Sequence, residues 1–316
     1  MPLDPMLLAA IVGTGILPPS EAKDPEEQRK LAVEYERAVF PTLGLDGPDA
    51  PTKDHVLSMD GYPDVLVRLF YPSEPVAGQA IPACLFFFGG AWRQGGLHHP
   101  SVAATCARRA VQANVVVAAV SYALAPEHPY PAALEQGYAA LEWLVREGES
   151  LGVDPNRIGV SGQSAGGNLT AALTHLNRAR ARHPLAFQIL EVPALDLTMG
   201  NLDHDAVELP EEQWASLRQM VDDYAPNAED VLTPTVSPLL ADNFDGLPPA
   251  YIFTAEVDPL RGDGEAYAMA LAADGVPTAV TRLIGLPHEG PAYERVSSTA
   301  RVAQAAIVDI LRSLHT

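Results

Sequence analysis

From about His55 onward, short apolar runs alternate with helical patterns, and this alternation restricts the possible folds more than any other feature of the chain. The runs are almost continuously apolar, as strands buried on both faces are. Such alternation predicts a mostly parallel sheet with helices on both faces. The expected strands are residues 64–71, 83–88, 114–122, 157–161, 186–192, 250–255 and 279–284, and the expected helices are residues 102–113, 132–149, 164–178, 263–274 and 297–314.

Two segments do not fit the alternation. Residues 1–54 combine an apolar start with a charged helical stretch at 24–40, and residues 198–236 are polar and acidic with a helical pattern near 211–224. One interpretation is that both are surface decoration. The other is that they form the two parts of a cap over the carboxyl ends of the strands, where open α/β sheets bind ligands. In that case residues 55–197 and 237–316 make up the core.

The net charge of the chain and the length of its apolar runs argue against nucleic acid and membranes as partners. The formal net charge is −20, from 40 acidic and 20 basic residues, so the surface repels nucleic-acid phosphates and anionic membranes. No run reaches the roughly 18–20 apolar residues needed to insert across a membrane. The apolar N-terminal stretch has no preceding Lys or Arg, unlike a secretory signal, and two cysteines make no disulfide framework. We therefore expect a soluble, cytoplasmic protein.

Residues 162–166 (GQSAG) lie between an expected strand and an expected helix. A nucleophile at a sharp strand-to-helix turn adopts a strained backbone, so the residues two positions away must be small. Gly162 and Gly166 satisfy this requirement, and the start of the next helix helps to hold a developing oxyanion. Chance matches to this pattern seldom fall between a strand and a helix. The pattern therefore predicts Ser164 as a catalytic nucleophile.

A serine hydroxyl needs a histidine base for activation. In enzymes with a nucleophile on such a turn, the acid and then the base follow along the chain. His288 is the candidate base because it lies in a loop directly after the expected strand 279–284. His204 falls in the candidate cap, and His315 is at the C-terminus.

The acid that orients the base has three candidates. Asp258 follows the expected strand 250–255, Asp196 follows an earlier strand, and Asp263 starts the next expected helix, where it suits a helix cap. Position favours Asp258 but does not exclude the other two.

A glycine-rich turn, residues 88–92 (FGGAW), follows the expected strand 83–88. Small residues let the backbone approach a substrate closely, and preorganised N–H groups stabilise a tetrahedral oxyanion. One N–H donor is expected from Ala165, directly after the nucleophile, and the others from this turn.

Three segments together resemble the bacterial hormone-sensitive-lipase-like carboxylesterases, which have the α/β-hydrolase fold. Residues 162–169 (GQSAGGNL) are similar to the family's GDSAGGNL motif, residues 121–132 (SYALAPEHPYPA) to YRLAPEHPFPA, and residues 255–261 (AEVDPLR) to the acid-bearing AExDPLRDE. The resemblance extends from about Pro63 to the C-terminus. It selects Asp258 as the acid and implies a cap built from the two segments described above.

The resemblance also implies an oxyanion hole and a substrate class. The N–H groups of Gly90 and Ala91 join that of Ala165 as donors, with Gly89 shaping the turn. Trp92 and apolar cap residues line an acyl pocket for short to medium chains. The implied activity is hydrolysis of small-molecule esters without a metal or cofactor.

The chain departs from the family pattern at three positions. Phe88 replaces the histidine of the family's HGGG turn, so Phe88 must hold the turn by packing. Gln163 replaces the acidic residue before the nucleophile, and Glu289 follows the catalytic histidine. None of these changes removes a catalytic atom, but together they indicate an unusual substrate or a narrower activity.

Other interpretations remain open from the sequence. The chain could be an acyltransferase, amidase or deacetylase for a specialised metabolite, or a non-catalytic binder of small ligands with the same fold. A homodimer is also left open. His98 and His99 are adjacent but lack partners at metal-ligand spacing, so we expect them to be solvated loop residues.

Overall fold

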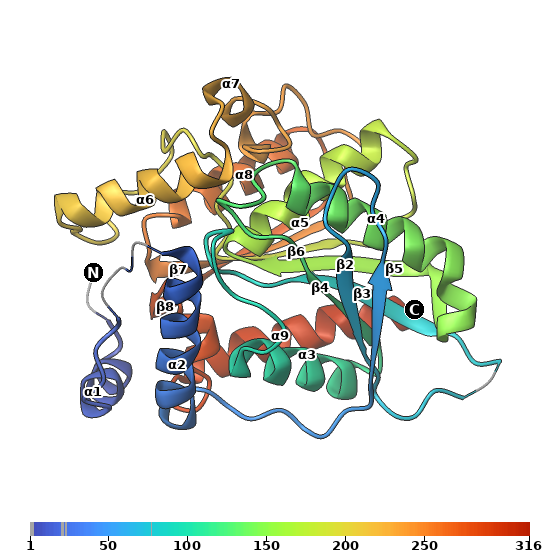
Figure 1. Ribbon diagram of the computed structural model, residues 1–316, viewed down its shortest axis with the longest axis horizontal. Helices are drawn as coiled ribbons and strands as arrows, with labels where there is room; N and C mark the ends of the chain where they lie inside the picture. Colours follow the sequence, from blue (N-terminus) through green and yellow to red (C-terminus); the bar gives the residue numbers. More distant parts are fainter. Residues whose placement is uncertain (1–2, 20–21, 23, 77) are drawn as a thin grey trace.

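The computed structural model describes residues 3–19, 22, 24–76 and 78–316, and these residues form one eight-stranded sheet (Figure 1). The strand order is β1-β2-β4-β3-β5-β6-β7-β8. β2 pairs antiparallel with β1 and with β4, and every pairing from β4 to β8 is parallel. The predicted fold class is therefore confirmed. The strands are β1 (Thr52–Leu57), β2 (Val65–Phe70), β3 (Ile81–Phe87), β4 (Val116–Ser121), β5 (Val153–Gln163), β6 (Gln188–Glu191), β7 (Ala250–Val257) and β8 (Thr278–Pro287).

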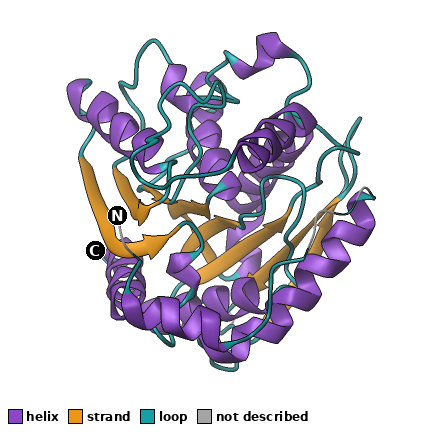
Figure 2. Cartoon of the chain, turned by 90° about the vertical axis from the view of Figure 1, so that its left-hand side faces the viewer, coloured by secondary structure: helices purple, strands orange, loops and turns teal. Residues whose placement is uncertain are grey.

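Helices cover both faces of the sheet (Figure 2). In Figure 1, α3 (Pro100–Ala113) and α9 (Ser298–Arg312) lie below the sheet, and α4 (Ala132–Glu147), α5 (Ala165–Ala179) and α8 (Arg261–Ala273) lie above it. The central strands β3 and β4 are buried over nearly their whole length. Burial on both faces explains why these strands are almost continuously apolar in sequence.

The two segments outside the alternation carry the remaining α-helices of the described part of the chain. α1 (Pro5–Gly13) and α2 (Pro25–Leu43) belong to the first segment, and α6 (Glu211–Tyr224) and α7 (Ala228–Val231) to the second. Residues 1–2, 20–21 and 23 of the first segment lie outside the described residues. α2 and α6 both contact the loop after β3, through Arg29 and Asp223, so both segments lie at the carboxyl end of that strand.

β1 and α1 are among the elements that have no counterpart in the expected helices and strands. β1 is an exposed edge strand of mostly polar sequence, so it lacks the apolar run that identifies a buried strand. α1 is stabilised at its start by Asp4, whose carboxylate accepts the amide of Met6 at 2.8 Å, and by Pro5 in the first turn.

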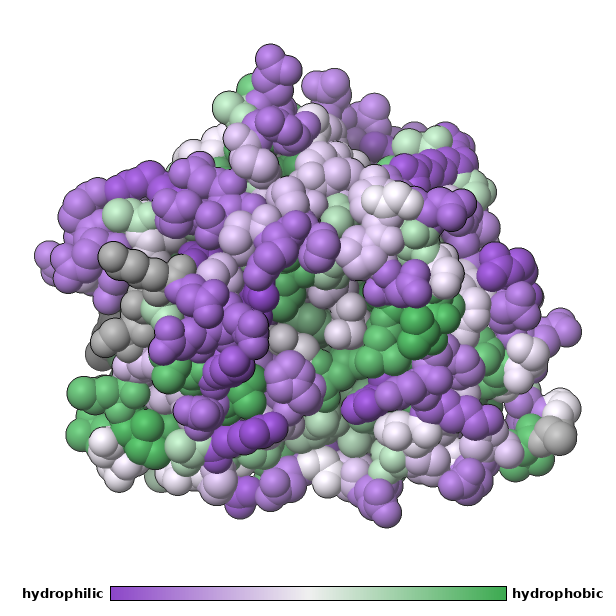
Figure 3. Space-filling model, in the orientation of Figure 1, coloured by the Kyte–Doolittle hydropathy of each residue, from purple (hydrophilic) through white to green (hydrophobic). Residues whose placement is uncertain are grey.

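The surface is mostly hydrophilic in the view of Figure 3, with hydrophobic residues gathered at the lower left over α1. Met6 and Val12 of α1 are strongly exposed, as is Leu17 after it. Within the described residues, no helix has the length and apolar character that crossing a membrane requires. Short one-turn helices complete the fold at Gly148–Leu151, Pro238–Leu240, Gly290–Ala292 and Ser313–His315.

Candidate active site

Ser164 lies at the turn between β5, which ends at Gln163, and α5, which begins at Ala165. Its backbone angles are φ 55° and ψ −118°, a strained conformation for a residue with a side chain. The turn closes tightly, because a Cβ atom added to Gly162 would lie 2.1 Å from the carbonyl oxygen of Gly166. A Cβ atom on Gly166 would lie 2.1 Å from the carbonyl oxygen of Phe87. Both small residues are therefore required by the packing of the turn.

The structure brings Ser164, His288 and Asp258 into one hydrogen-bonded chain. Ser164 Oγ lies 2.8 Å from His288 Nε2, and Asp258 Oδ2 lies 2.7 Å from His288 Nδ1. His288 follows the end of β8 and its side chain is 29 % exposed, whereas that of Asp258, after β7, is 2 % exposed. Asp258 Oδ1 also accepts the amide of Leu260 at 2.9 Å, which fixes the carboxylate against rotation. This is the geometry in which a carboxylate orients an imidazole that removes a hydroxyl proton.

The charge of Asp258 controls the proton affinity of His288. Burial lowers the pKa of His288, but the negative charge of Asp258 and its hydrogen bond raise that pKa by more, to about 9. The nearby carboxylate of Glu289 makes a smaller contribution to the same rise in pKa. An imidazolium is therefore well stabilised beside Ser164.

The rival acids have other partners. The carboxylate of Asp196 accepts the hydroxyl of Thr198 at 2.5 Å and the amide of Asn201 at 2.7 Å. Asp263 Oδ2 accepts the backbone amides of Leu195 and Asp196 at 2.8 and 2.9 Å. Both carboxylates thus hold the loop after β6.

The rival histidines also lie in other contacts. His204 packs on Trp214 with ring centroids 4.9 Å apart, and His315 Nε2 lies 3.1 Å from the carbonyl oxygen of Ala113. His288 is therefore the histidine that the structure places at Ser164.

The glycine-rich turn lies directly against the nucleophile. A Cβ atom added to Gly89 would lie 3.3 Å from Cβ of Ser164. Gly90 has φ 128° and Ala91 has φ 52°. Within the described part of the chain, the amides of Gly90 and Ala91 donate no hydrogen bond. Binding of an oxyanion requires free N–H groups of this kind near the nucleophile, and Gly90 and Ala91 directly follow the residue that lies against Ser164.

Phe88 holds the turn from behind by packing. Its side chain is 1 % exposed and stacks on Tyr122 with ring centroids 4.3 Å apart. The hydroxyl of Tyr122 donates to the carbonyl oxygen of Phe88 at 2.8 Å. Phe88, at the position where the resembled family has histidine, thus holds the turn by packing, as we expected from the sequence.

Trp92, the expected pocket residue, is buried beneath the second candidate cap segment. It is 4 % exposed and stacks on Tyr224 of α6 with ring centroids 4.4 Å apart and planes 9° from parallel. Tyr224 is itself 1 % exposed. Trp92 therefore connects the glycine-rich turn to α6.

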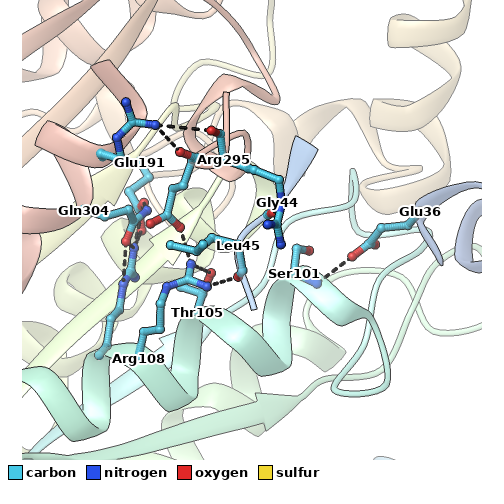
Figure 4. A network of polar contacts seen from close by, with 12 residues as sticks. Glu36, Gly44, Leu45, Ser101, Thr105, Arg108, Glu191, Arg295 and Gln304 are labelled. Carbon is cyan, nitrogen blue, oxygen red and sulfur yellow. Dashed lines mark hydrogen bonds and ion pairs between the residues drawn. The ribbon is translucent and has the colours of Figure 1, made fainter. Parts of the chain in front are cut away.

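A buried ion pair supports the nucleophile turn from the side of α3 and α9. The amide of Ser164 donates to the backbone oxygen of Glu191 at 2.8 Å. The carboxylate of Glu191 accepts Arg109 Nη2, at 2.8 Å to each oxygen, and Gln304 Nε2 at 3.3 Å (Figure 4). The side chains of Arg109 and Glu191 are each 3 % exposed. Sequence reasoning missed this pair; its one local signal is a carboxylate at the end of a short strand whose middle residues, Ile189 and Leu190, are apolar.

Polar contacts also join α3 to the first candidate cap segment. Glu36 of α2 binds His99 and accepts the amide of Ser101 at 2.7 Å, and Arg108 binds Glu294 and the carbonyl oxygen of Leu45 (Figure 4). His99 is thus paired and 6 % exposed, not solvated as the sequence led us to expect, because α2 covers it. No group of His, Cys, Asp and Glu side chains suited to a metal ion is found among the described residues.

Comparison with known proteins gives consistent matches. Residues 84–291 match the model of a family described as having the alpha/beta hydrolase fold. Carboxylesterase NlhH of Mycobacterium tuberculosis is 36 % identical over 85 % of this chain and 84 % of its own. Ethyl acetate hydrolase of Pseudomonas putida is 31 % identical over 98 % of this chain and 95 % of its own. The solved structure of an esterase from Pyrobaculum calidifontis is 30 % identical and matches with a TM-score of 0.88, over 100 % of this chain and 99 % of its own.

These matches cover the core as well as most of the remaining chain, and the family match spans the segments whose motifs suggested the relationship. The chain belongs to the hormone-sensitive-lipase-like carboxylesterase family of α/β hydrolases.

Proposed function

We propose that this carboxylesterase cleaves esters of short to medium acyl chains through a covalent acyl-enzyme on Ser164. The observation that carries the proposal is the hydrogen-bonded chain from Ser164 Oγ through His288 to Asp258, at 2.8 and 2.7 Å. The name of the relative from Pseudomonas putida, ethyl acetate hydrolase, supports the short end of the acyl range.

In the proposed first half-reaction, Ser164 Oγ attacks the acyl carbonyl while His288 Nε2 takes the hydroxyl proton. The oxyanion accepts hydrogen bonds from the amides of Gly90, Ala91 and Ala165. His288 then gives its proton to the leaving alcohol, and Asp258 stabilises the imidazolium in between.

In the second half-reaction, water attacks the acyl-enzyme by the same route. His288 takes a proton from water and returns it to Ser164 Oγ as the carboxylic acid leaves. No step needs a metal or an organic cofactor.

Substrate access in this proposal depends on residues 1–54 and 198–236 acting as a cap. Support comes from α2 and α6, which both contact the loop after β3. Trp92, stacked on Tyr224, would form a wall of the acyl pocket. We also place the enzyme in the cytoplasm; Cys84 and Cys106 are free and buried, which suits a reducing compartment.

The test is release of p-nitrophenol from a series of acyl esters, from acetate to palmitate. We expect activity to peak at short chains and to disappear in Ser164→Ala. Ser161→Ala is the matched control, because it removes a buried hydroxyl three residues earlier, in the strand that leads into the turn, and should keep the activity. Undiminished hydrolysis by Ser164→Ala would refute the proposed nucleophile, and a peak at palmitate would refute the acyl range.

A further inference from the structure

The backbone just after the proposed oxyanion donors has an unusual conformation. Gly90, Ala91 and Trp92 have φ values of 128°, 52° and 57° in succession. A left-handed backbone is unfavourable for residues with a side chain, so contacts from outside the turn must hold it. Inside the turn, the carbonyl oxygen of Gly90 accepts the amides of Arg93 and Gln94, each at 3.0 Å.

The first outside contact comes from Arg29 of α2. Arg29 Nε donates to the carbonyl oxygen of Arg93 at 2.8 Å, and Nη2 donates to that of Ala125 at 2.9 Å. Ala125 in turn donates its amide to the carbonyl oxygen of Trp92 at 2.9 Å. Glu127 orients the guanidinium through bonds of 2.9 and 2.6 Å. The side chain of Arg29 thus links α2 to the two backbone segments beside the turn, at Arg93 and at Ala125.

The second outside contact comes from the end of α6. Arg93 Nε lies 3.0 Å from Asp223 Oδ2, and the two side chains are only 22 % and 17 % exposed. The next residue, Tyr224, stacks on Trp92 and accepts the amide of Tyr130 at 2.7 Å through its backbone oxygen. α2 therefore contacts Arg93 directly and Trp92 through Ala125, whereas α6 contacts both Trp92 and Arg93 directly.

We propose that Arg29 and Asp223 are positioning residues that make the oxyanion hole depend on docking of both candidate cap segments. Arg29 and Asp223 act through Arg93. When α2 and α6 are both docked, the turn holds the amides of Gly90 and Ala91 toward Ser164. When either helix is released, the turn relaxes and these two donors are lost. Binding of a substrate beneath the docked helices then coincides with assembly of the hole. This inference rests on the proposed function, because it assigns a role to the oxyanion turn of that same site.

The variants Asp223→Asn and Arg29→Met test the coupling. Asp223→Asn keeps the size of the side chain and an oxygen for Gln219, which donates to Asp223 Oδ1 at 2.9 Å. Both variants should lower kcat by about 10- to 100-fold with KM changed little, because a small misplacement of transition-state donors costs this much. Affinity for a trifluoromethyl ketone, which forms a tetrahedral adduct with an oxyanion, should fall by the same factor.

The matched controls lie on the same helices but away from the turn. Lys30→Met on α2 breaks the exposed pair with Glu26, and Arg218→Met on α6 breaks the exposed pair with Glu211. Both controls should keep kcat and ketone affinity within twofold of wild type. Hydrogen exchange at the amides of Arg93 and Gln94, which both donate to the carbonyl oxygen of Gly90, should be faster in Asp223→Asn and Arg29→Met, and unchanged in the controls.

The outcomes separate the coupling from the proposed function. Ser164-dependent esterase activity in the wild type, with kcat and exchange at Arg93 and Gln94 unaltered in Asp223→Asn and Arg29→Met, would overturn the coupling alone. A loss of kcat that merely follows a loss of folded protein, measured by melting temperature, would also overturn it. A wild-type protein without esterase activity would overturn both.

Discussion

The backbone oxygen of Glu191, the last residue of β6, accepts the amide of Ser164 at 2.8 Å. The strained backbone of Ser164 is therefore tied to a neighbouring strand as well as to its own helix. Because the carboxylate of Glu191 is itself held by Arg109, a buried charge pair supports the residue that carries the proposed nucleophile.

Glu191→Gln should be strongly destabilising, because it leaves the guanidinium of Arg109 buried without a charged partner. We expect the free energy of unfolding to fall by about 3 kcal/mol or more. Urea denaturation measures this loss. The control is Asp54→Asn, which breaks the exposed pair with Arg68, whose side chains are 45 % and 31 % exposed, and should cost less than about 1 kcal/mol. Equal losses in the two variants would contradict a supporting role for the buried pair.

The activity should depend on the protonation of His288. Since Asp258 raises the pKa of His288 to about 9, the base is protonated at neutral pH, and kcat/KM should increase as pH rises through that value. Asp258→Asn removes the charge that raises the pKa, so the increase should move to lower pH while the maximal rate falls by about four orders of magnitude. Glu289→Gln should also move the increase in kcat/KM to lower pH, but by a smaller amount than Asp258→Asn. A pH profile that is unchanged in Asp258→Asn would exclude Asp258 as the partner of His288.

Gly90→Ala tests the turn itself. A Cβ atom at Gly90 would lie 2.2 Å from the carbonyl oxygen of Gln94, and φ is 128° there. We expect kcat to fall by about 100-fold or more, as on removal of an oxyanion donor. Gly246→Ala is the control, because Gly246 also has a positive φ of 73° but a Cβ atom there meets nothing within 4 Å. It should retain full activity in the same steady-state assay.

The sequence predicted the parts of the site that depend on local pattern. The requirement for small residues around Ser164 is visible within five positions of the chain. The order of nucleophile, acid and base left three candidate histidines, and the position of His288 in a loop after an expected strand selected it. Choosing Asp258 over Asp263 needed the family resemblance, since both follow the same strand. The structure shows why position alone was insufficient: both carboxylates are buried and hydrogen-bonded to backbone amides.

The contacts that support the site could not be predicted, because they join residues distant in sequence. Arg109 and Glu191 are 82 positions apart, and Arg29 and Ala125 are 96 positions apart. Charged residues on helices are ordinarily solvated, so nothing in the local pattern distinguishes Arg29 from its neighbour Lys30. β1 escaped prediction for a similar reason, since an exposed edge strand needs no apolar run.

The carboxylate of Asp263 should make stability decrease as pH rises toward neutrality. Burial raises its pKa from 3.8 to about 7, although two backbone amides act against this. The folded chain therefore binds a proton that the unfolded chain releases between these values, and the free energy of unfolding declines across that range. Asp263→Asn keeps an oxygen for both amides and cannot ionise. It should therefore reduce the decline in the free energy of unfolding by a few kcal/mol, because each unit of pKa shift corresponds to about 1.4 kcal/mol.

The control for this pH dependence is again Asp54→Asn. Arg68 lowers the pKa of Asp54, so Asp54 is ionised in both states above its ordinary pKa of 3.8, and its stabilising contribution is lost only as pH falls further. Its removal should therefore shift stability by a constant amount between pH 5 and 8. Urea unfolding at several pH values distinguishes the two variants, and parallel profiles for Asp263→Asn and the wild type would rule out titration of Asp263 as the cause.

The covalent intermediate is the most direct test of the proposed chemistry. Protein mixed with p-nitrophenyl acetate and quenched in acid within the first turnovers can be digested and examined by mass spectrometry. We expect one acetyl group on the peptide that contains Ser164, absent in Ser164→Ala and present in Ser161→Ala. An acetyl group on another residue, or steady release of p-nitrophenol by Ser164→Ala, would contradict a mechanism through Ser164.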